Sequence, residues 1–143
     1  MTRAEIAAFF PQKEGVQLNF GASSYAVPTL AWLQGDFWNY FYRQLWDESL
    51  QKWTVRWECR DFARAYACMA QLCWAKTQGA AATDDGLAVG EFWFIPDATK
   101  PTEGHAICAV FTENGLQFID PQVGTSLWQM SHEQFSSSYF LRF

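Results

Sequence analysis

The hydrophobic pattern of this 143-residue chain changes its period once, after Gly86. Before that point, apolar residues recur at spacings of three and four, which is typical of amphipathic helices; after it they alternate in short runs, which is typical of strands. Helices followed by short consecutive strands favour an antiparallel sheet. The pattern therefore predicts an α+β fold, and residues 1–143 are expected to form a single domain because neither a repeat nor a linker divides them.

Two helical regions are expected before the middle of the chain. Thr2 and Glu5 fit a capping box, which predicts a short helix over residues 3–10. Apolar spacing between residues 30 and 50 predicts either one long helix or two short ones, with Gly35 as the weak point. The Gly-, Ser- and Asn-containing stretch that separates these regions is expected to be a loop with at most a short extended piece.

The clearest helical stripe begins at Phe62 and ends near Gly79, and residues 79–86 are expected to form a connecting loop. Beyond that loop, short β-branched and aromatic runs predict strands over 87–95, 105–112, 116–120, 125–129 and 139–143. The Asn114-Gly115 pair predicts a hairpin, because both residues accept positive φ angles. A second capping box, at Ser131 and Gln134, predicts a short helix near the end.

Charge and cysteine spacing exclude several classes of function. The chain has 10 basic and 15 acidic residues, a net charge of −5 and no basic run, so a nucleic-acid partner is not expected. Its four cysteines lack a CxxC pair, so neither a metal site nor any other cofactor is expected. The first ten residues do not resemble a signal peptide, and eighteen uninterrupted apolar residues occur nowhere. We therefore expect no membrane association and a cytoplasmic protein.

Cys59 is the candidate nucleophile because it stands at the start of the clearest helix. Unpaired backbone N–H groups and the positive end of the helix dipole favour the thiolate there. A buried structural cysteine is the alternative interpretation of this position. The other cysteines, Cys68, Cys73 and Cys108, fall on apolar stripes and are expected to fill the core.

His105 and Asp120 are the candidate partners of Cys59. His105 opens a predicted strand after Gly104, a glycine that permits another segment to approach closely. If the strands turn at Asn114, paired positions sum to about 229, which places His105 opposite residue 124 and Asp120 near its imidazole. A neutral imidazole can take the proton of a thiol within hydrogen-bond reach. A partly buried structural histidine and an Asp-Pro turn are the alternatives.

This order of elements resembles the transglutaminase-like branch of the papain-like cysteine enzymes. Three segments carry the resemblance: Cys59-Arg60-Asp61-Phe62-Ala63, Gly104-His105-Ala106 and Phe118-Ile119-Asp120-Pro121-Gln122. A looser similarity to small phage-associated members rests on the segment from Tyr25 to Pro28 and on Trp32. The resemblance implies a papain-like/transglutaminase-like fold, in which the helix that carries Cys59 packs on an antiparallel sheet, and a Cys-His-Asp catalytic triad.

The resemblance also implies a binding site for the acyl oxyanion. In such enzymes the N–H of the nucleophile and a donor just upstream hold this oxygen. The candidates are Gln51, Trp53 and Trp57, with Gln122 as a further substrate-binding candidate. Trp53 stands where a papain-like enzyme has a glutamine; its indole N–H can also donate, although a core aromatic is the alternative.

Two functions are open at this point. The first is a cysteine-dependent acyl-transfer enzyme that hydrolyses a peptide or glutamine side-chain amide, with a peptide or protein as its substrate. Cys59 would attack, His105 would move the proton and Asp120 would orient His105. The second is a phage or host-interaction binding protein that keeps the fold with little or no catalysis. The complete triad favours the enzyme.

Overall fold

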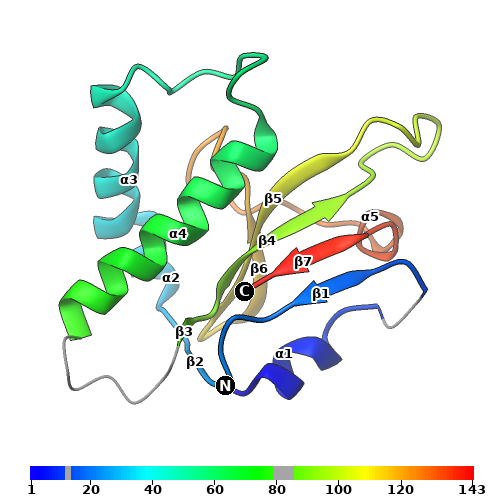
Figure 1. Cartoon of the computed structure of the whole chain (residues 1–143), viewed down its shortest axis with the longest axis horizontal. Coiled ribbons are helices and arrows are strands. Elements are labelled where there is room, and N and C mark those ends of the chain that lie inside the picture. The colour runs from blue at the N-terminus through cyan, green and yellow to red at the C-terminus, as the bar shows by residue number, and fades with distance from the viewer. Residues whose placement is uncertain (12–13, 79–85) are drawn as a thin grey trace.

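A five-stranded sheet with the strand order β1-β7-β4-β5-β6 organises the chain (Figure 1). The computed structural model describes residues 1–11, 14–78 and 86–143. The strands of this sheet are β1 (Gln17–Asn19), β4 (Val89–Phe94), β5 (His105–Thr112), β6 (Gly115–Ile119) and β7 (Phe140–Arg142). Two further strands, β2 (Tyr25–Ala26) and β3 (Gly86–Leu87), pair only with each other.

Helices cover both faces of the large sheet. They are α1 (Arg3–Ala8), α2 (Leu30–Gln34), α3 (Asp36–Asp47), α4 (Cys59–Gln78) and α5 (His132–Ser136). In Figure 1, α4 crosses the sheet near β4 and β5, and α3 lies on the outer side of α4. The opposite face packs against α1, through Ile6 and the following Phe10. None of the described helices combines the length and apolar character that a membrane crossing requires.

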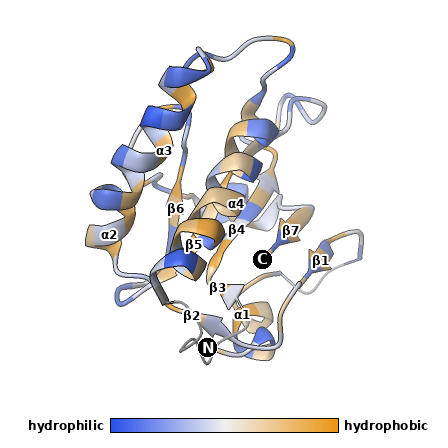
Figure 2. Ribbon diagram, turned by 60° about the vertical axis from the view of Figure 1, so that its left-hand side comes forward, coloured by the Kyte–Doolittle hydropathy of each residue, from blue (hydrophilic) through white to orange (hydrophobic). Residues whose placement is uncertain are grey.

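Strand β5 is buried on both faces, which explains its nearly continuous apolar sequence. Ala106, Cys108 and Val110 belong to the core shared with α3 and α4. Ile107, Ala109 and Phe111 alternate with them and belong to the second core, beneath α1. Successive side chains of a strand point to opposite faces, so β5 joins the two cores. Figure 2 shows a different pattern on α3, where hydrophilic residues alternate with hydrophobic ones along the ribbon.

The region between residues 30 and 50 forms two helices, and Gly35 lies between them. Gly35 has φ −109° and ψ −99°, outside the helical range. A Cβ at this position would lie 2.9 Å from the carbonyl oxygen of Ala31, closer than real Cβ atoms come. A glycine is therefore the residue that allows the chain to turn here. The two predicted capping boxes, at Thr2 and Ser131, are confirmed.

The expectation of a purely antiparallel sheet is wrong. β1 runs parallel to β7, and β2 runs parallel to β3. Strands β1 and β2 both lie in the stretch between residues 15 and 28, which the sequence indicated as mainly loop. Their pairing depends on strands far away in the chain, and such contacts leave no local pattern.

Residues 125–129 do not form the expected strand. A single bridge joins Leu127 to Ile119. The chain turns directly after β6, where Val123 and Gly124 donate backbone hydrogen bonds to the carbonyl oxygen of Asp120, and Gly124 has a φ of +130°. This turn redirects the chain before a ladder can form. The predicted loop at 79–86 lies, except for Gly86, outside the described residues.

Candidate functional site

The first residue of α4, Cys59, is half-buried against the start of β5. Burial raises the pKa of its thiol, but hydrogen bonds from His105 and from the backbone N–H of Ala106 outweigh this effect. The positive charge of His105 and the backbone N–H of Arg60 act in the same direction. The pKa of Cys59 is therefore lowered, which increases the share of nucleophilic thiolate at neutral pH.

His105, the first residue of β5, lies between two acidic partners. Its Nε2 is 2.7 Å from Oδ2 of Asp120, and its ring also hydrogen-bonds to Cys59. Burial lowers the pKa of His105, but the hydrogen bonds and negative charges of Asp120 and Cys59 raise it to about 9. Because Asp120 engages Nε2, Nδ1 is the nitrogen left for Cys59. The two shifts act in the same direction, because each ionised partner favours the ionised form of the other.

Asp120 is buried and held through both carboxylate oxygens. Only 2% of its surface is exposed. Oδ2 contacts His105, and Oδ1 accepts a hydrogen bond from the backbone N–H of Gln122 at 3.0 Å. A buried carboxylate is costly unless it is paired and hydrogen-bonded, and both conditions are met here. Asp120 therefore fixes the orientation of the imidazole.

The strand register differs by two positions from the expected one. The expected pairing would have placed residue 121 opposite Cys108, whereas the structure pairs Cys108 with Ile119. The turn lies one residue earlier than expected, since Thr112 pairs with Gly115 and leaves Glu113 and Asn114 between them. Asp120 thus follows the last residue of β6 directly. The structure brings Cys59, His105 and Asp120 together, although the register used to place them was inaccurate.

The four further candidates lie in different environments. Gln51 donates its side-chain amide to the carbonyl oxygen of Leu45, 3.1 Å away, near the end of α3. The Trp53 side chain is 57% exposed. Gln122 contributes its backbone N–H to Asp120. Their roles as oxyanion or substrate-binding groups stay predictions.

Trp57 is the candidate donor with the most unusual environment. Its indole nitrogen is buried, and it has no hydrogen-bond partner among the residues that the structure describes. The ring packs edge-on against Phe62, with 5.3 Å between centroids. This packing places Trp57 beside the first turn of α4. Its role as a donor also stays a prediction.

Three aromatic residues near His105 were not found from the sequence. The ring of Trp128 lies 5.6 Å from that of His105, and Phe94 contacts both. Tyr139 lies against Gly104, directly before His105. Gly104 was the available signal, since a glycine before a strand indicates close approach by another segment. Nothing in the sequence indicated which segment approaches.

A second feature is a pocket of about 470 Å³ between α2, α3 and α4. Trp32, Trp74 and Asp36 line it, together with Thr29 and Thr77. Trp32 stacks on Phe37 with 5.0 Å between ring centroids, which fixes the plane of its indole. The described residues contain no group of three or more His, Cys, Asp or Glu side chains able to hold a metal ion.

Comparisons with known proteins identify the fold but not a family. No family model matches this chain, and no curated protein matches it. Among solved structures, one described as "PSL1a-E64 complex" is similar over 100% of this chain, with a TM-score of 0.71 and 17% identity. Polyporus squamosus lectin, bound to the human-type influenza-binding epitope Neu5Aca2-6Galb1-4GlcNAc, matches over 100% with a TM-score of 0.72 and 18% identity.

This chain spans about half the length of each similar protein, 50% and 49% respectively. At 17–18% identity, the likeness establishes a shared fold and nothing about activity. The chain therefore has a mixed α+β fold that also occurs in half of a lectin chain.

These findings correct three expectations drawn from the resemblance. The assignment to the transglutaminase-like or papain-like family is wrong. One similar structure is described as a lectin, and no family model matches. The papain-like/transglutaminase-like fold class is corrected with it. The acyl-transfer function, with its hydrolase and thiol-protease labels, is likewise not supported. The physical reason is that a Cys, His and Asp in a given order describe a local site, and similar sites occur on unrelated folds.

Proposed function

We propose that this chain is a ligand-binding protein whose binding site is centred on the activated thiol of Cys59. The observation that carries the proposal is the position of His105, held by Asp120 at 2.7 Å and hydrogen-bonded to Cys59. This arrangement presents a nucleophilic sulfur and a proton donor side by side. The proposed ligand carries an electrophilic carbon.

Capture of such a ligand has a balanced chemistry, for which an epoxide is the simplest example. The thiolate of Cys59 attacks a ring carbon, so that an S–C bond forms and a C–O bond breaks. The released alkoxide takes the proton from Nδ1 of His105. Asp120 stabilises the imidazolium until that transfer. The ligand then stays attached, and each protein molecule reacts once.

Both similar structures contain a ligand by their descriptions, one E64 and the other a sialylated glycan. This agrees with a binding role for the shared fold and supplies two compounds for testing. It supports the binding protein, which was the alternative left open by the sequence, more than the enzyme.

The test compares Cys59 with Cys68, an exposed cysteine of the same chain that serves as an internal reference. Under limiting iodoacetamide at pH 7, mass spectrometry should find Cys59 labelled first. In His105→Ala, the alkylation pKa of Cys59 should rise toward the free-thiol value of about 8.5. Prior incubation with E64 should protect Cys59 but not Cys68.

Two outcomes would contradict this proposal. Equal reactivity of Cys59 in wild type and His105→Ala, from pH 5 to 9 on folded protein, would show that the thiol and imidazole are not coupled. Multiple turnover of a peptide or glutamine amide by the wild-type protein, absent in Cys59→Ser, would show that release follows capture and that binding is not the principal activity.

A second candidate function is glycan binding in the pocket lined by Trp32 and Trp74. Indole faces pack against the apolar faces of sugar rings, and the Asp36 carboxylate can accept hydrogen bonds from sugar hydroxyls. Neu5Aca2-6Galb1-4GlcNAc, the epitope bound by the similar lectin, is the first glycan to titrate. Tryptophan fluorescence should saturate in wild type and in Trp46→Ala, whose indole is 64% exposed outside the pocket. Trp74→Ala should abolish the change, whereas no saturation in wild type contradicts this candidate for this epitope.

A further inference from the structure

Gly104 leaves a space directly before His105, and the Tyr139 side chain fills it. A Cβ at Gly104 would overlap the hydroxyl oxygen of Tyr139 and would lie 3.4 Å from its Cζ. The overlap involves the hydroxyl, whereas the contact to the ring carbon is ordinary packing. A side chain at residue 104 would therefore displace the hydroxyl of Tyr139.

Tyr139 lies at the start of β7, and strand β4 separates it from Gly104, the residue that its side chain contacts. Its N–H donates a 3.1 Å hydrogen bond to the carbonyl oxygen of Trp93. The next residue, Phe140, pairs with Trp93, and Phe94 pairs with His105 on the other side of β4. The Tyr139 side chain thus extends from the start of β7, over the end of β4, to the start of β5.

The hydroxyl of Tyr139 is available to a ligand. The side chain is 37% exposed, and its ring is held edge-on against Trp93 with 6.2 Å between centroids. Within residues 1–11, 14–78 and 86–143, the structure gives this hydroxyl no hydrogen-bond partner. Burial and the negative charge of Cys59 raise the pKa of Tyr139, so the hydroxyl remains protonated at neutral pH. It is therefore a protonated donor at Gly104, the residue directly before His105, within range of the charge of Cys59.

We propose that the Tyr139 hydroxyl selects ligands by donating a hydrogen bond to an oxygen next to their electrophilic carbon. The inference rests on the proposed capture at Cys59 and narrows its ligand class. The preferred ligands carry a carbonyl or carboxylate oxygen adjacent to the carbon that the sulfur attacks. His105 and Tyr139 then serve different atoms, since His105 protonates the leaving group and Tyr139 orients the ligand.

The experiment uses two alkylating reagents that differ in this oxygen. Iodoacetamide has a carbonyl next to its reacting carbon, whereas iodoethane has no acceptor there. Tyr139→Phe should slow alkylation of Cys59 by iodoacetamide about five-fold, the effect of losing one neutral hydrogen bond. The rate with iodoethane and the alkylation pKa of Cys59 should not change. Cys68 provides the reference rate for each reagent.

A second variant tests the same contact from the other side. Gly104→Ala should displace the hydroxyl and slow iodoacetamide to the same extent. In the double variant Gly104→Ala/Tyr139→Phe, the rate should equal that of Tyr139→Phe alone, because the overlapping atom is gone.

An unchanged iodoacetamide rate in Tyr139→Phe would overturn the inference, and so would an equal slowing of both reagents. Either result leaves the coupling of Cys59 to His105 intact. Failure of the proposed function is distinguishable, because it appears already in wild type as an ordinary alkylation pKa of Cys59.

Discussion

Among the residues that the structure describes, two buried carboxylates have basic partners, and they differ in what those partners can do. Asp120 is paired with His105, an imidazole whose pKa is raised to about 9 and which can therefore gain and lose a proton. Glu91 is 1% exposed and pairs with Arg64 and Arg142, which stay charged at all relevant pH values. A titratable partner lets a buried carboxylate support proton transfer, whereas permanently charged partners make it a structural clamp.

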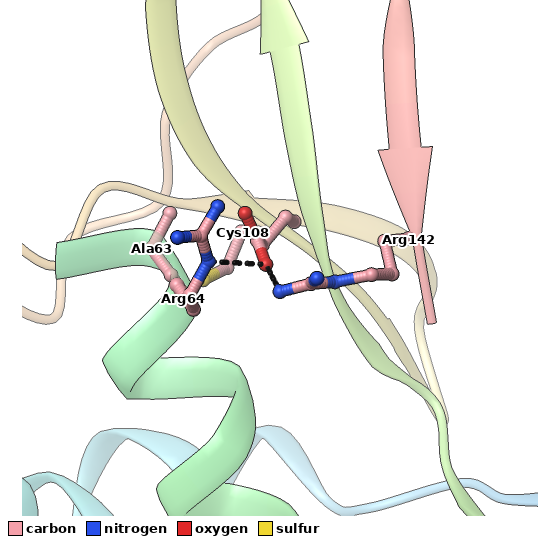
Figure 3. A network of polar contacts seen from close by, with 5 residues as sticks. Ala63, Arg64, Cys108 and Arg142 are labelled. Carbon is pink, nitrogen blue, oxygen red and sulfur yellow. Dashed lines mark hydrogen bonds and ion pairs between the residues drawn. The ribbon is translucent and has the colours of Figure 1, made fainter. Parts of the chain in front are cut away.

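Figure 3 shows how Arg64 of α4 and Arg142 of β7 converge from opposite sides. Nε of Arg64 is 3.4 Å from Oε1 of Glu91, and Nη2 of Arg142 donates to the same oxygen. Glu91 lies on β4 opposite Arg142 in the strand pairing. The clamp therefore joins the helix that begins with Cys59 to the strands beneath it, without including the thiol.

The largest expected effect is the loss of stability when the clamp formed by Glu91, Arg64 and Arg142 is broken. In the double variant Arg64→Ala/Arg142→Ala, Glu91 remains buried without a cationic partner. We expect this to lower the free energy of unfolding by about 3 kcal/mol. The value is at the lower end for a broken buried pair, because both arginines are partly exposed. Urea unfolding should show this loss. The alkylation pKa of Cys59 should stay as in wild type. A shifted pKa at unchanged stability would mean that the two regions are not separate.

A smaller effect is expected in the pH dependence of stability, measured in Cys59→Ala so that the thiol does not titrate. Burial lowers the pKa of His105, but the hydrogen bond and negative charge of Asp120, which this variant keeps, raise it. We expect the pKa to stay raised without Cys59, so that the protonated imidazole stabilises the fold. This contribution is complete below the unfolded pKa of about 6.5 and is lost as the pH rises through the higher folded pKa. Denaturant midpoints from pH 6 to 10 should fall accordingly. The fall should be absent in Cys59→Ala/His105→Ala; if it persists there, another group is responsible.

The smallest effect is expected from Asp120→Asn. The amide still orients the imidazole but no longer offers a negative charge, so the alkylation pKa of Cys59 should rise less than in His105→Ala. Iodoacetamide rates measured across pH 5 to 9 provide both values. The reverse order, with Asp120→Asn having the larger effect, would mean that the carboxylate acts on the thiol without His105.

Local parts of this architecture were accessible from the sequence. The apolar stripe after Cys59 predicted α4, and Asn114-Gly115 predicted the hairpin between β5 and β6. These features depend on residues a few positions apart, so a pattern within one segment is sufficient. The family and its fold label could not be obtained in this way, because three side chains and their order do not specify a topology.

The sequence by itself thus determined the helices, the central strands β4, β5 and β6, and which cysteine begins a helix. Only the tertiary structure decided that β1 joins β7 in parallel, that Asp120 follows β6 at the point where His105 can reach it, and that Tyr139 occupies the space left by Gly104. The physical reason is that these contacts join residues far apart in the chain. Their geometry depends on how whole elements pack against one another, and no local spacing records it.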